Sequence, residues 1–257
     1  KVSVILTTYN SENQILEVIN SIMCQEGQDN LFEIELLIID DCSTDNTINI
    51  LEKNNIAYLK TKNNTGGPNK GRNIALNICT GDFICIADHD DIWFTNKIKK
   101  LLEVSHLAPI ITSGYVLSDY SSSNKVIRVS KSLDKKDYIE YLKNETFLSK
   151  LTKSKAGQQT YLGSILFASS LKHILFEEEY GMIDFDWVLK LFHNQHSVEL
   201  CSALYLRKVE GNNLSLNEQY RINDYNYSLR TISSYKSKYP SEVKFAEKKI
   251  NGSFGRY

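Results

Sequence analysis

The first hundred residues alternate between short apolar runs and stretches whose apolar residues recur at helical spacing. Residues 1–8 and 32–39 are rich in β-branched and other apolar residues, and residues 83–87 are apolar at every position. A strand that does not alternate is buried on both faces, as in a parallel sheet covered by helices. Between the first two strands, apolar residues from Ile15 to Met23 recur at helical spacing. The pattern predicts an α/β fold with a doubly wound, mostly parallel sheet built from βαβ units.

Shorter patterns complete this half of the chain. Ser11 to Gln14 has the form of a capping box, in which side chains satisfy the free N–H groups at a helix start. Further elements are predicted in this order: a helix capped by Ser43 or Thr44, a short strand over 56–59, a helix around 72–78 and a helix that begins near Trp93.

Three polar clusters each follow directly on a predicted strand. They are residues 7–10, Asp40 with Asp41, and residues 88–91. Doubly wound sheets bind ligands outside the carboxyl ends of their strands. We therefore expect the three clusters to lie together on one rim of the sheet.

Asp88 and Asp90 form the cluster most indicative of chemistry. Strand side chains alternate, so these two carboxylates are expected to point the same way and His89 the other. Neighbouring carboxylates repel unless a cation or a proton lies between them. Carboxylate and diphosphate oxygens suit Mn²⁺ or Mg²⁺, which predicts a metal site. The alternative is a polar turn that caps the following helix.

The other two polar segments leave two interpretations open. A carboxylate of Asp40 or Asp41 is placed to accept hydrogen bonds from a base or ribose, as in dinucleotide folds; the alternative is helix capping. Residues 66–73 combine a Gly-rich turn, two cations and a helix start, which favours phosphate binding. That segment lacks the Walker spacing and the G-x-G-x-x-G fingerprint.

Composition excludes several classes of protein. The 257 residues carry a net charge of −1, so no basic excess is present to bind a nucleic-acid backbone. The five cysteines are odd in number and have no C-x-x-C spacing, which favours a reducing compartment such as the cytoplasm over a disulfide framework. No stretch approaches the ~18 apolar residues of a membrane span. The chain begins on a predicted strand without Met, which leaves room for a preceding leader or domain.

The clusters together resemble the inverting family 2 glycosyltransferases of GT-A fold. Four motifs carry the resemblance, in family order: residues 2–10, residues 39–47, Arg72–Asn73 with residues 81–84, and residues 87–93. The resemblance implies transfer of one sugar from a nucleotide-diphosphate donor to an acceptor hydroxyl, with inversion at the sugar carbon. It favours a UDP-sugar as donor and Mn²⁺ or Mg²⁺ as cofactor. The implied acceptor is a saccharide or lipid-linked saccharide, in bacterial surface polysaccharide or lipooligosaccharide synthesis.

The resemblance also implies roles for the matching positions. Asp41 would hold the base, Asp88 would contact the ribose or the metal, and Asp90 would bind the metal. Thr7 stands where the family usually has Pro, and His89 replaces a smaller residue. The expected donor-binding residues are Thr7, Tyr9, Asp41, Gly67, Arg72 and Asp88, and the expected metal ligands are Asp88 and Asp90.

Residues 183–191 resemble the helix that carries the catalytic base of the family. The family often has Glu-Asp there, and this chain has Ile183-Asp184, so Asp184 aligns with the base and Asp186 is its close competitor. Asp184 at the start of a helix is also a plausible N-terminal cap. Residues 207–215 resemble the loop after the last strand; many members have His where Glu210 falls, and Arg207 remains as a candidate contact to the diphosphate.

We divide the chain into a donor-binding half (1–105), a half with the acceptor site and catalytic base (106–216) and a C-terminal helical region (217–257), within one continuous domain. The rival function is a non-catalytic nucleotide-sugar-binding or interaction module. A phosphatase is less consistent, because its D-x-D follows the first strand and here it follows the fourth. Residues 217–249 are rich in Tyr and Lys, which favours helix packing with a wet outer face; the alternative is contact with a partner or with an anionic membrane at its inner, cytoplasmic face.

Overall fold

One mixed sheet forms the centre of the molecule. The computed structural model describes residues 1–119, 125–129, 137–154, 157–209 and 218–254. Within these ranges the sheet has ten strands, in the order β3-β2-β1-β4-β9-β6-β10-β5, with β7 paired to β6 and β8 paired to β10. The strands are β1 (Val2–Thr8), β2 (Ile34–Asp40), β3 (Leu59–Lys60), β4 (Phe83–Ala87), β5 (Asp91–Trp93), β6 (Ile110–Asp119), β7 (Lys125–Val129), β8 (Tyr138–Tyr141), β9 (Leu166–Ala168) and β10 (Ser197–Val209).

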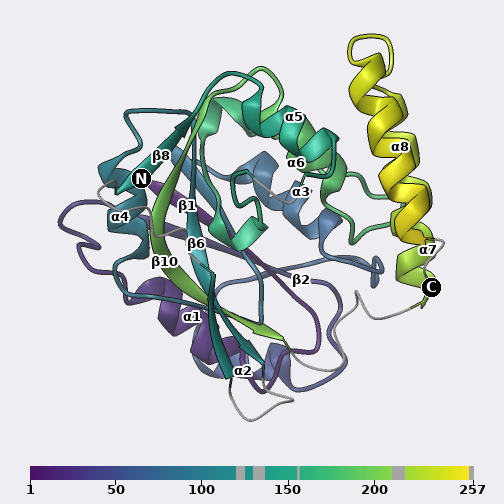
Figure 1. Ribbon diagram of the computed structural model, residues 1–257. Coiled ribbons are helices and arrows are strands. Elements are labelled where there is room, and N and C mark those ends of the chain that lie inside the picture. Colours follow the sequence, from purple (N-terminus) through teal and green to yellow (C-terminus); the bar gives the residue numbers. More distant parts are fainter. Residues whose placement is uncertain (120–124, 130–136, 155–156, 210–217, 255–257) are drawn as a thin grey trace.

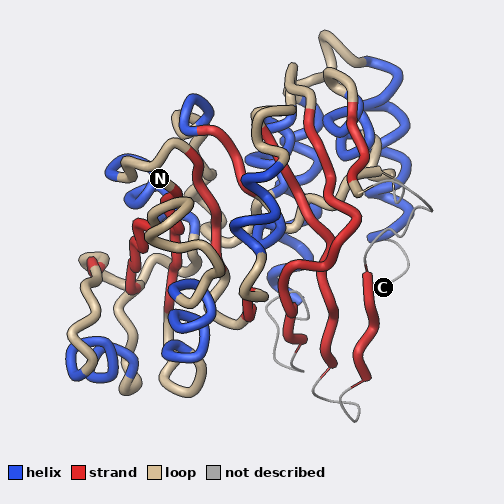
Figure 2. The backbone as a smooth tube through the Cα atoms, turned by 90° about the vertical axis from the view of Figure 1, so that its left-hand side faces the viewer, coloured by secondary structure: helices blue, strands red, loops and turns tan. Residues whose placement is uncertain are grey.

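Strand direction confirms the predicted α/β sheet. β1 is parallel to β2 and β4, β2 is parallel to β3, and β6 is parallel to β10. β9 lies between β4 and β6 and runs antiparallel to both, so the two parallel groups point the same way. The strands β5, β7 and β8 are antiparallel to their partners. The sheet is therefore mostly parallel, with the reversed strand β9 in its middle. Figure 2 shows the strands of the sheet running side by side.

Helices cover both faces of the sheet and enclose two cores. One core lies under α1 (Ile15–Met23), α2 (Thr47–Lys53) and α4 (Lys97–Glu103). The other lies under α3 (Asn69–Ile78), α5 (Glu145–Leu151), α6 (Phe185–Phe192), α7 (Glu218–Ser233) and α8 (Pro240–Phe254). Two short 3₁₀ turns, η1 (Leu162–Ser164) and η2 (Ser169–Leu171), flank β9. Figure 1 shows α7 and α8 at the outer edge of the second layer, beyond α6.

Burial on both faces explains why the strands do not alternate in sequence. On β1, Val4 contributes to the first core and Ile5 to the second; on β4, Cys85 and Ile86 divide in the same way. All four side chains are fully buried. Complete burial of a Val or Ile side chain contributes roughly 1.5–3 kcal/mol, so both faces of these strands stabilise the fold.

Four local predictions are wrong. α2 begins at Thr47 after Asn46 without a side-chain cap, so neither Ser43 nor Thr44 caps this helix. α1 has no capping box: the Ser11 hydroxyl donates to the carbonyl of Tyr9, its amide donates to Thr47 Oγ1, and the helix begins at Ile15 without a side-chain cap. The strand expected over 56–59 is reduced to β3. The helix expected near Trp93 is instead β5, because this segment pairs with β10, more than a hundred residues later. The helix α4 begins only at Lys97.

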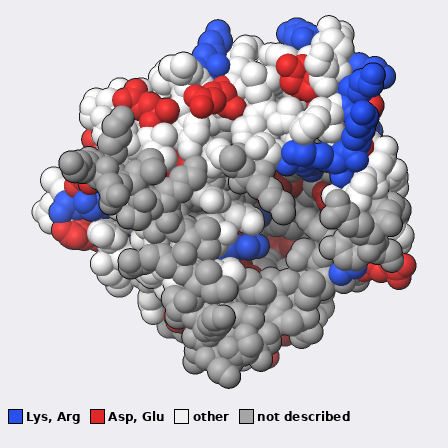
Figure 3. All heavy atoms as spheres, in the orientation of Figure 1, with Lys and Arg blue, Asp and Glu red and all other residues white. Residues whose placement is uncertain are grey.

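The C-terminal region confirms the predicted helical extension. Aromatic rings from the α7–α8 connection pack on Phe147 of α5, with centroid distances of 5.0 Å to Tyr235 and 5.1 Å to Tyr239. Figure 3 shows Lys and Arg side chains along the outer face of this region, which agrees with a solvent-exposed surface. Among the described residues, no helix combines the length and the apolar character that crossing a bilayer requires.

Candidate functional site

The three polar clusters lie side by side at the carboxyl ends of the parallel strands, as predicted. The register pairs Thr8 of β1 with Asp40 of β2, and Leu6 of β1 with Ala87 of β4. The residues that follow these positions therefore share one rim. Tyr9 is 42% exposed at this rim, whereas Thr7 is buried, with its methyl group against the Cα of Gly71.

The two aspartates at the end of β2 have different partners. Asp40 is fully buried and accepts hydrogen bonds from the backbone N–H and the hydroxyl of Ser43. Asp41 accepts from Thr61 Oγ1 at 2.9 Å and from the backbone N–H of Thr65 at 3.0 Å. Asp40 thus shapes the turn after β2, whereas Asp41 anchors the loop that leads to α3. Asp41 is therefore the aspartate that contacts Thr65, the residue directly before the Gly-rich turn.

Arg72 of α3 connects this turn to the acidic cluster. Its side chain is 5% exposed. One guanidinium nitrogen, Nη2, donates to Asp88 Oδ1 at 2.8 Å, and the other, Nη1, donates to Asn69 Oδ1 at 3.1 Å. The buried Nε–H has no partner among the described residues. A buried donor without a partner costs free energy, which is consistent with a ligand that accepts this hydrogen bond.

Asp88, Asp90 and Asp91 form a cluster of like charges. Burial raises the pKa of Asp90, and the Asp88 carboxylate raises it further. Burial, with Asp88 and Asp90, raises the pKa of Asp91 well above its ordinary value. Arg72 offsets part of the charge on Asp88. The remaining repulsion favours a proton or a cation at Asp90.

These carboxylates suit Mn²⁺ or Mg²⁺, which prefer oxygen ligands. In the described part of the chain, no group of three or more His, Cys, Asp or Glu is placed to hold a metal ion by itself. Oxygens from a bound diphosphate would therefore have to complete the shell. Asp88 and Asp90, the two predicted ligands, would then supply only part of the coordination shell. Metal binding would accordingly depend on a bound diphosphate.

Two cations lie next to the acidic cluster, and one of them is absent from the sequence-based prediction. The β5–β10 pairing places Arg207 opposite Asp91, and its guanidinium lies 4.5 Å from the ring centroid of Tyr161. Lys97 is fully buried; its ammonium donates to the carbonyl of Gly163, and burial lowers its pKa to about 8. Lys97 belongs to a Lys-rich segment whose sequence predicts a solvent-exposed helix. Nothing in the sequence therefore marks Lys97 as buried.

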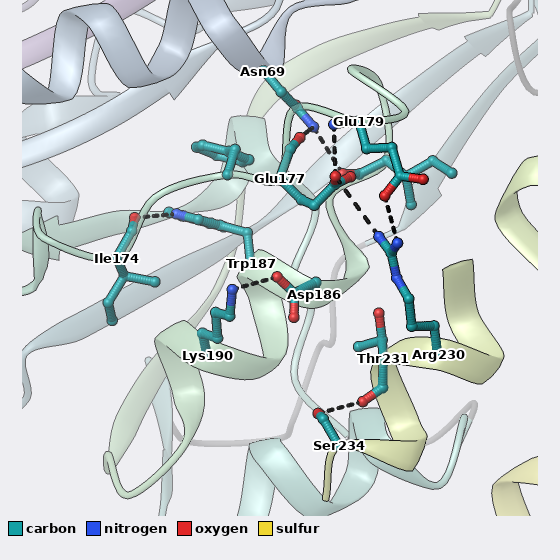
Figure 4. Close-up of polar contacts among 12 residues, drawn as sticks. Asn69, Ile174, Glu177, Glu179, Asp186, Trp187, Lys190, Arg230, Thr231 and Ser234 are labelled. Atoms are coloured by element: carbon teal, nitrogen blue, oxygen red, sulfur yellow. Dashed lines mark hydrogen bonds and ion pairs between the residues drawn. The ribbon is translucent and has the colours of Figure 1, made fainter. Parts of the chain in front are cut away.

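Asp184 precedes α6 without capping it. The Asp184 carboxylate accepts no capping hydrogen bond from the backbone N–H groups at the helix start, which removes the capping interpretation. Burial raises its pKa, the charge of Arg72 lowers it and the charge of Asp88 raises it. Hydrogen bonds connect this residue's neighbour to the ion pair: Arg72 donates to Asn69, and Asn69 donates to the carbonyl of Ile183, the residue before Asp184. Asp186, in contrast, forms an ion pair of 2.6 Å with Lys190 on the same helix (Figure 4).

The neighbours of Asp184 come from segments far apart in sequence. Lys153, at the end of α5, lies 3.4 Å from the ring centroid of Phe185 and donates to the hydroxyl of Ser228 on α7. Burial lowers the pKa of Lys153, while Asp224 and Asp184 raise it. Sequence reasoning missed Lys153, because no motif marks it. Glu210, discussed above, lies outside the described residues.

The glutamates at positions 177–179 contact two different helices. Arg230 of α7 pairs with Glu179 and, at 3.7 Å, with Glu177, as Figure 4 shows. The third member, Glu178, accepts from Asn73 Nδ2 at 2.8 Å. The segment that leads to Asp184 is thus held from one side by α3 and from the other by α7.

Comparisons with known proteins agree with this geometry. Residues 3–170 match the family described as Glycosyl transferase family 2. The sequence is 43% identical over 101 residues to the poly(ribitol-phosphate) beta-N-acetylglucosaminyltransferase TarS of Staphylococcus aureus, covering 38% of this chain and 17% of TarS. It is 32% identical over 145 residues to the Escherichia coli UDP-Glc:alpha-D-GlcNAc-diphosphoundecaprenol beta-1,3-glucosyltransferase WfgD, covering 56% of this chain and 55% of WfgD.

A similar architecture is found among solved structures. A crystal structure of a Staphylococcus aureus TarS fragment in complex with UDP-GlcNAc superposes with a TM-score of 0.71 at 27% identity, covering 91% of this chain and 66% of that one. The same fragment without ligand gives a TM-score of 0.70 over the whole chain at 23% identity, which shows a shared fold. The chain spans between 17% and 55% of the length of the two relatives named above.

Proposed function

The chain belongs to glycosyl transferase family 2, and on that premise we propose that it transfers a sugar from a UDP-sugar to an acceptor hydroxyl with inversion at the sugar carbon. The observation that carries the proposal is the arrangement at the rim, where Arg72 pairs with Asp88 of the acidic cluster and is joined through Asn69 to the carbonyl of Ile183, the residue before Asp184. The UDP-GlcNAc complex of the similar TarS fragment supports uridine as the base.

On the donor side, we assign binding to the residues that the motifs indicated and that lie at or just behind the rim. We assign Asp41 to the base and Arg72, through its unpartnered Nε–H, to an acceptor oxygen of the donor; the hydrogen bond of Asp41 to Thr65 and the buried Nε–H support this assignment. Arg207, opposite Asp91, adds a positive charge on the diphosphate side. The proposed donor contacts are Thr7, Tyr9, Asp41, Gly67, Arg72 and Asp88.

We further propose that donor binding depends on Mn²⁺ or Mg²⁺ held by Asp88 and Asp90. The raised pKa of Asp90 supports this assignment, because a cation would relieve its repulsion with Asp88. When bound, such an ion stabilises the negative charge that develops on the leaving diphosphate. Arg72 contributes in the same direction, since its guanidinium is already fixed toward Asp88.

Asp184 is the proposed general base. Its carboxylate is not used for capping and lies beside the donor-side residues, where it would accept the proton of the acceptor hydroxyl as that oxygen attacks the anomeric carbon. A pKa raised by burial suits this role, because a stronger base accepts the proton more readily. A single displacement of this kind inverts the configuration.

The acceptor belongs to the same proposal at a coarser level. Relatives named above act on poly(ribitol-phosphate) and on a diphosphoundecaprenol-linked sugar, and a further one of Bacillus subtilis is described as a putative teichuronic acid biosynthesis glycosyltransferase. We propose a saccharide or lipid-linked saccharide acceptor in bacterial surface polysaccharide synthesis. We assign residues 1–105 to the donor and residues 106–216 to the acceptor and base.

A thermal-shift screen of nucleotide diphosphates and their sugars, with and without Mn²⁺, tests the donor assignment. A ligand that binds only the folded state stabilises it by roughly 2.7 kcal/mol at a hundredfold excess over Kd. We expect a metal-dependent shift with UDP and one UDP-sugar, followed by UDP release when acceptor or water is present. A shift without any UDP release would favour the non-catalytic binding module, and no shift with any nucleotide would contradict both.

A further inference from the structure

Asn69 uses both ends of its side-chain amide. It is the first residue of α3 and is completely buried. Its Oδ1 accepts from Arg72 Nη1 at 3.1 Å. Its Nδ2 donates to the carbonyl oxygen of Glu177 at 2.8 Å and to that of Ile183 at 2.9 Å. Figure 4 shows Asn69 directed toward Glu177, in the segment that leads to α6.

These bonds form one continuous connection between the donor rim and the proposed base. Asp88 accepts from Arg72, Arg72 donates to Asn69, and Asn69 donates to Ile183, the residue before Asp184. Every group in the middle of this connection is buried, where hydrogen bonds are stronger and where an unmade bond is costly.

Close backbone packing reinforces the connection. The backbone N–H of Asn69 donates to the carbonyl oxygen of Gly181 at 2.9 Å. A Cβ at Gly67 would lie 2.3 Å from that same oxygen, so the turn before α3 and the segment before Asp184 are in direct contact. The segment therefore has little room to move relative to α3 as long as Asn69 holds it.

We propose that Asn69 is a positioning residue that fixes the backbone of the base-bearing segment to the Arg72–Asp88 ion pair, so that Asp184 is held at the donor site. The inference rests on the proposed function. It extends that function to a residue outside the proposed donor contacts. Displacement of a reacting group by about 1 Å can cost on the order of 10²-fold in rate, so this connection is expected to affect turnover more than donor binding.

Asn73 provides a matched control, because it holds the same segment farther from Asp184. It also lies on α3 and is buried, and it donates to the carbonyl of Phe176 and accepts from the N–H of Phe176. Loss of either amide removes a similar number of buried hydrogen bonds. Only the loss of Asn69 breaks the connection to Ile183.

The test is a double-mutant cycle, measured as UDP release from UDP-GlcNAc with Mn²⁺, or from the UDP-sugar that the thermal-shift screen selects. The variants are Asn69→Ala, Asn73→Ala, Asp184→Asn and the two double combinations. We expect Asn69→Ala to lower kcat roughly 10- to 10²-fold, with donor Kd by calorimetry changed less than about threefold. In the Asp184→Asn background the same substitution should have little further effect, because the group that it positions is already gone.

Asn73→Ala should lower the rate by the same factor in both backgrounds. Additive effects of Asn69→Ala and Asp184→Asn would overturn the proposal. Asn69→Asp gives a second readout, because it keeps an acceptor for Arg72 but cannot donate to Ile183; wild-type turnover in this variant would also overturn it. If the unaltered protein binds no UDP-sugar and releases no UDP, the proposed function itself fails, which is a different result from additivity in an active enzyme.

Discussion

Arg72 and Asp88 form a 2.8 Å ion pair that is buried at one end and open at the other. The guanidinium is 5% exposed, while the Asp88 side chain is 36% exposed. The cation is therefore fixed by the fold, and the carboxylate remains partly accessible to a ligand. A ligand that binds there meets a site whose charge is already partly neutralised, which reduces the cost of bringing a diphosphate close to three aspartates.

Replacing Arg72 by Met should weaken donor binding. The change removes the partner of Asp88 and the unpartnered Nε–H together, so we expect the Kd for UDP-sugar to rise about tenfold or more, in line with the 1.5–3 kcal/mol typical of a hydrogen bond to a charged group. Calorimetry with and without Mn²⁺ measures the effect. The Kd of Arg72→Lys should lie between those of the parent and Arg72→Met. A single ammonium group cannot replace the two guanidinium nitrogens that donate to Asp88 and Asn69. Equal affinity in all three proteins would argue against a donor role.

Asp184→Asn should lower turnover by roughly 10²–10⁴-fold, the usual contribution of general-base assistance, and leave donor affinity nearly unchanged. Steady-state UDP release and calorimetry separate the two effects. Asp186→Asn is the control, because Asp186 is paired with Lys190 and should change the rate only a few fold. The opposite ranking of the two variants would move the base to Asp186.

Asp90→Asn should have opposite effects on function and stability. It removes a proposed metal ligand, so the part of donor binding that requires Mn²⁺ should disappear. It also removes a charge whose folded-state pKa is raised, and such a charge destabilises the fold above that pKa. The ligand-free variant should therefore have a Tm equal to or above that of the parent at pH 7 to 8. A lower Tm, or unchanged metal-dependent binding, would contradict the assignment.

Glu35 should make the stability of the fold depend on acid. Burial of this β2 carboxylate opposes its ionisation, but hydrogen bonds from Ser3 and Thr80 outweigh burial and lower its pKa to about 2. A lowered pKa stabilises the folded state above the unfolded-state value near 4.5, and this contribution is lost as the pH falls from there toward 2.

Glu35→Gln should accordingly lose about 1–2 kcal/mol of unfolding free energy at pH 7, and its difference from the parent should shrink below pH 4.5. Urea unfolding across this range measures both. Glu33→Gln, at an exposed neighbouring position, is the control and should follow the parent at every pH. If the difference in unfolding free energy between Glu35→Gln and the parent did not change with pH, the effect would come from altered packing and not from the ionisation of Glu35.

Two glycines of one turn should respond differently to Ala. At Gly67 the new methyl would lie 2.3 Å from the Gly181 carbonyl oxygen, which should cost about 1–3 kcal/mol of stability and shift the segment that carries Asp184. At Gly66 nothing lies within 4 Å, and only its φ of +79° opposes the change, at about 1–2 kcal/mol. Both variants should have a lower Tm. Only Gly67→Ala should lose turnover beyond what its stability explains, and equal turnover in the two variants would contradict the coupling.

The order of elements was predictable wherever a local pattern decides it. Phe83 to Ala87 are apolar throughout and Val2 to Thr8 are mostly apolar, and burial on two faces accounts for both patterns. β5 was not predictable, because Asp91 to Trp93 become a strand only by pairing with Arg207 to Tyr205. Ser11 has the residue type of a cap, yet its N–H and hydroxyl serve the loop before α1 instead.

The residues of the candidate site also fall into two groups, those that sequence motifs identify and those that only tertiary contacts reveal. Asp88, Asp90 and Asp184 stand in motifs, so their types and positions can be recognised along the chain. Asn69 and Lys153 have no such marking. Their partners lie on other elements, Ile183 for Asn69 and Ser228 for Lys153, and only tertiary packing brings these pairs together.

The reversed strand β9 has a consequence for the order in which the protein can fold during synthesis. β4 is complete at Ala87, but its second neighbour, β9, begins only at Leu166. Until then one edge of a fully apolar strand is left without its partner, and unpaired edges of this kind are prone to aggregate. We expect a nascent chain that stops after α4 to need a chaperone or a bound ribosome to remain in solution, because the sheet closes only when β9 has inserted between β4 and β6.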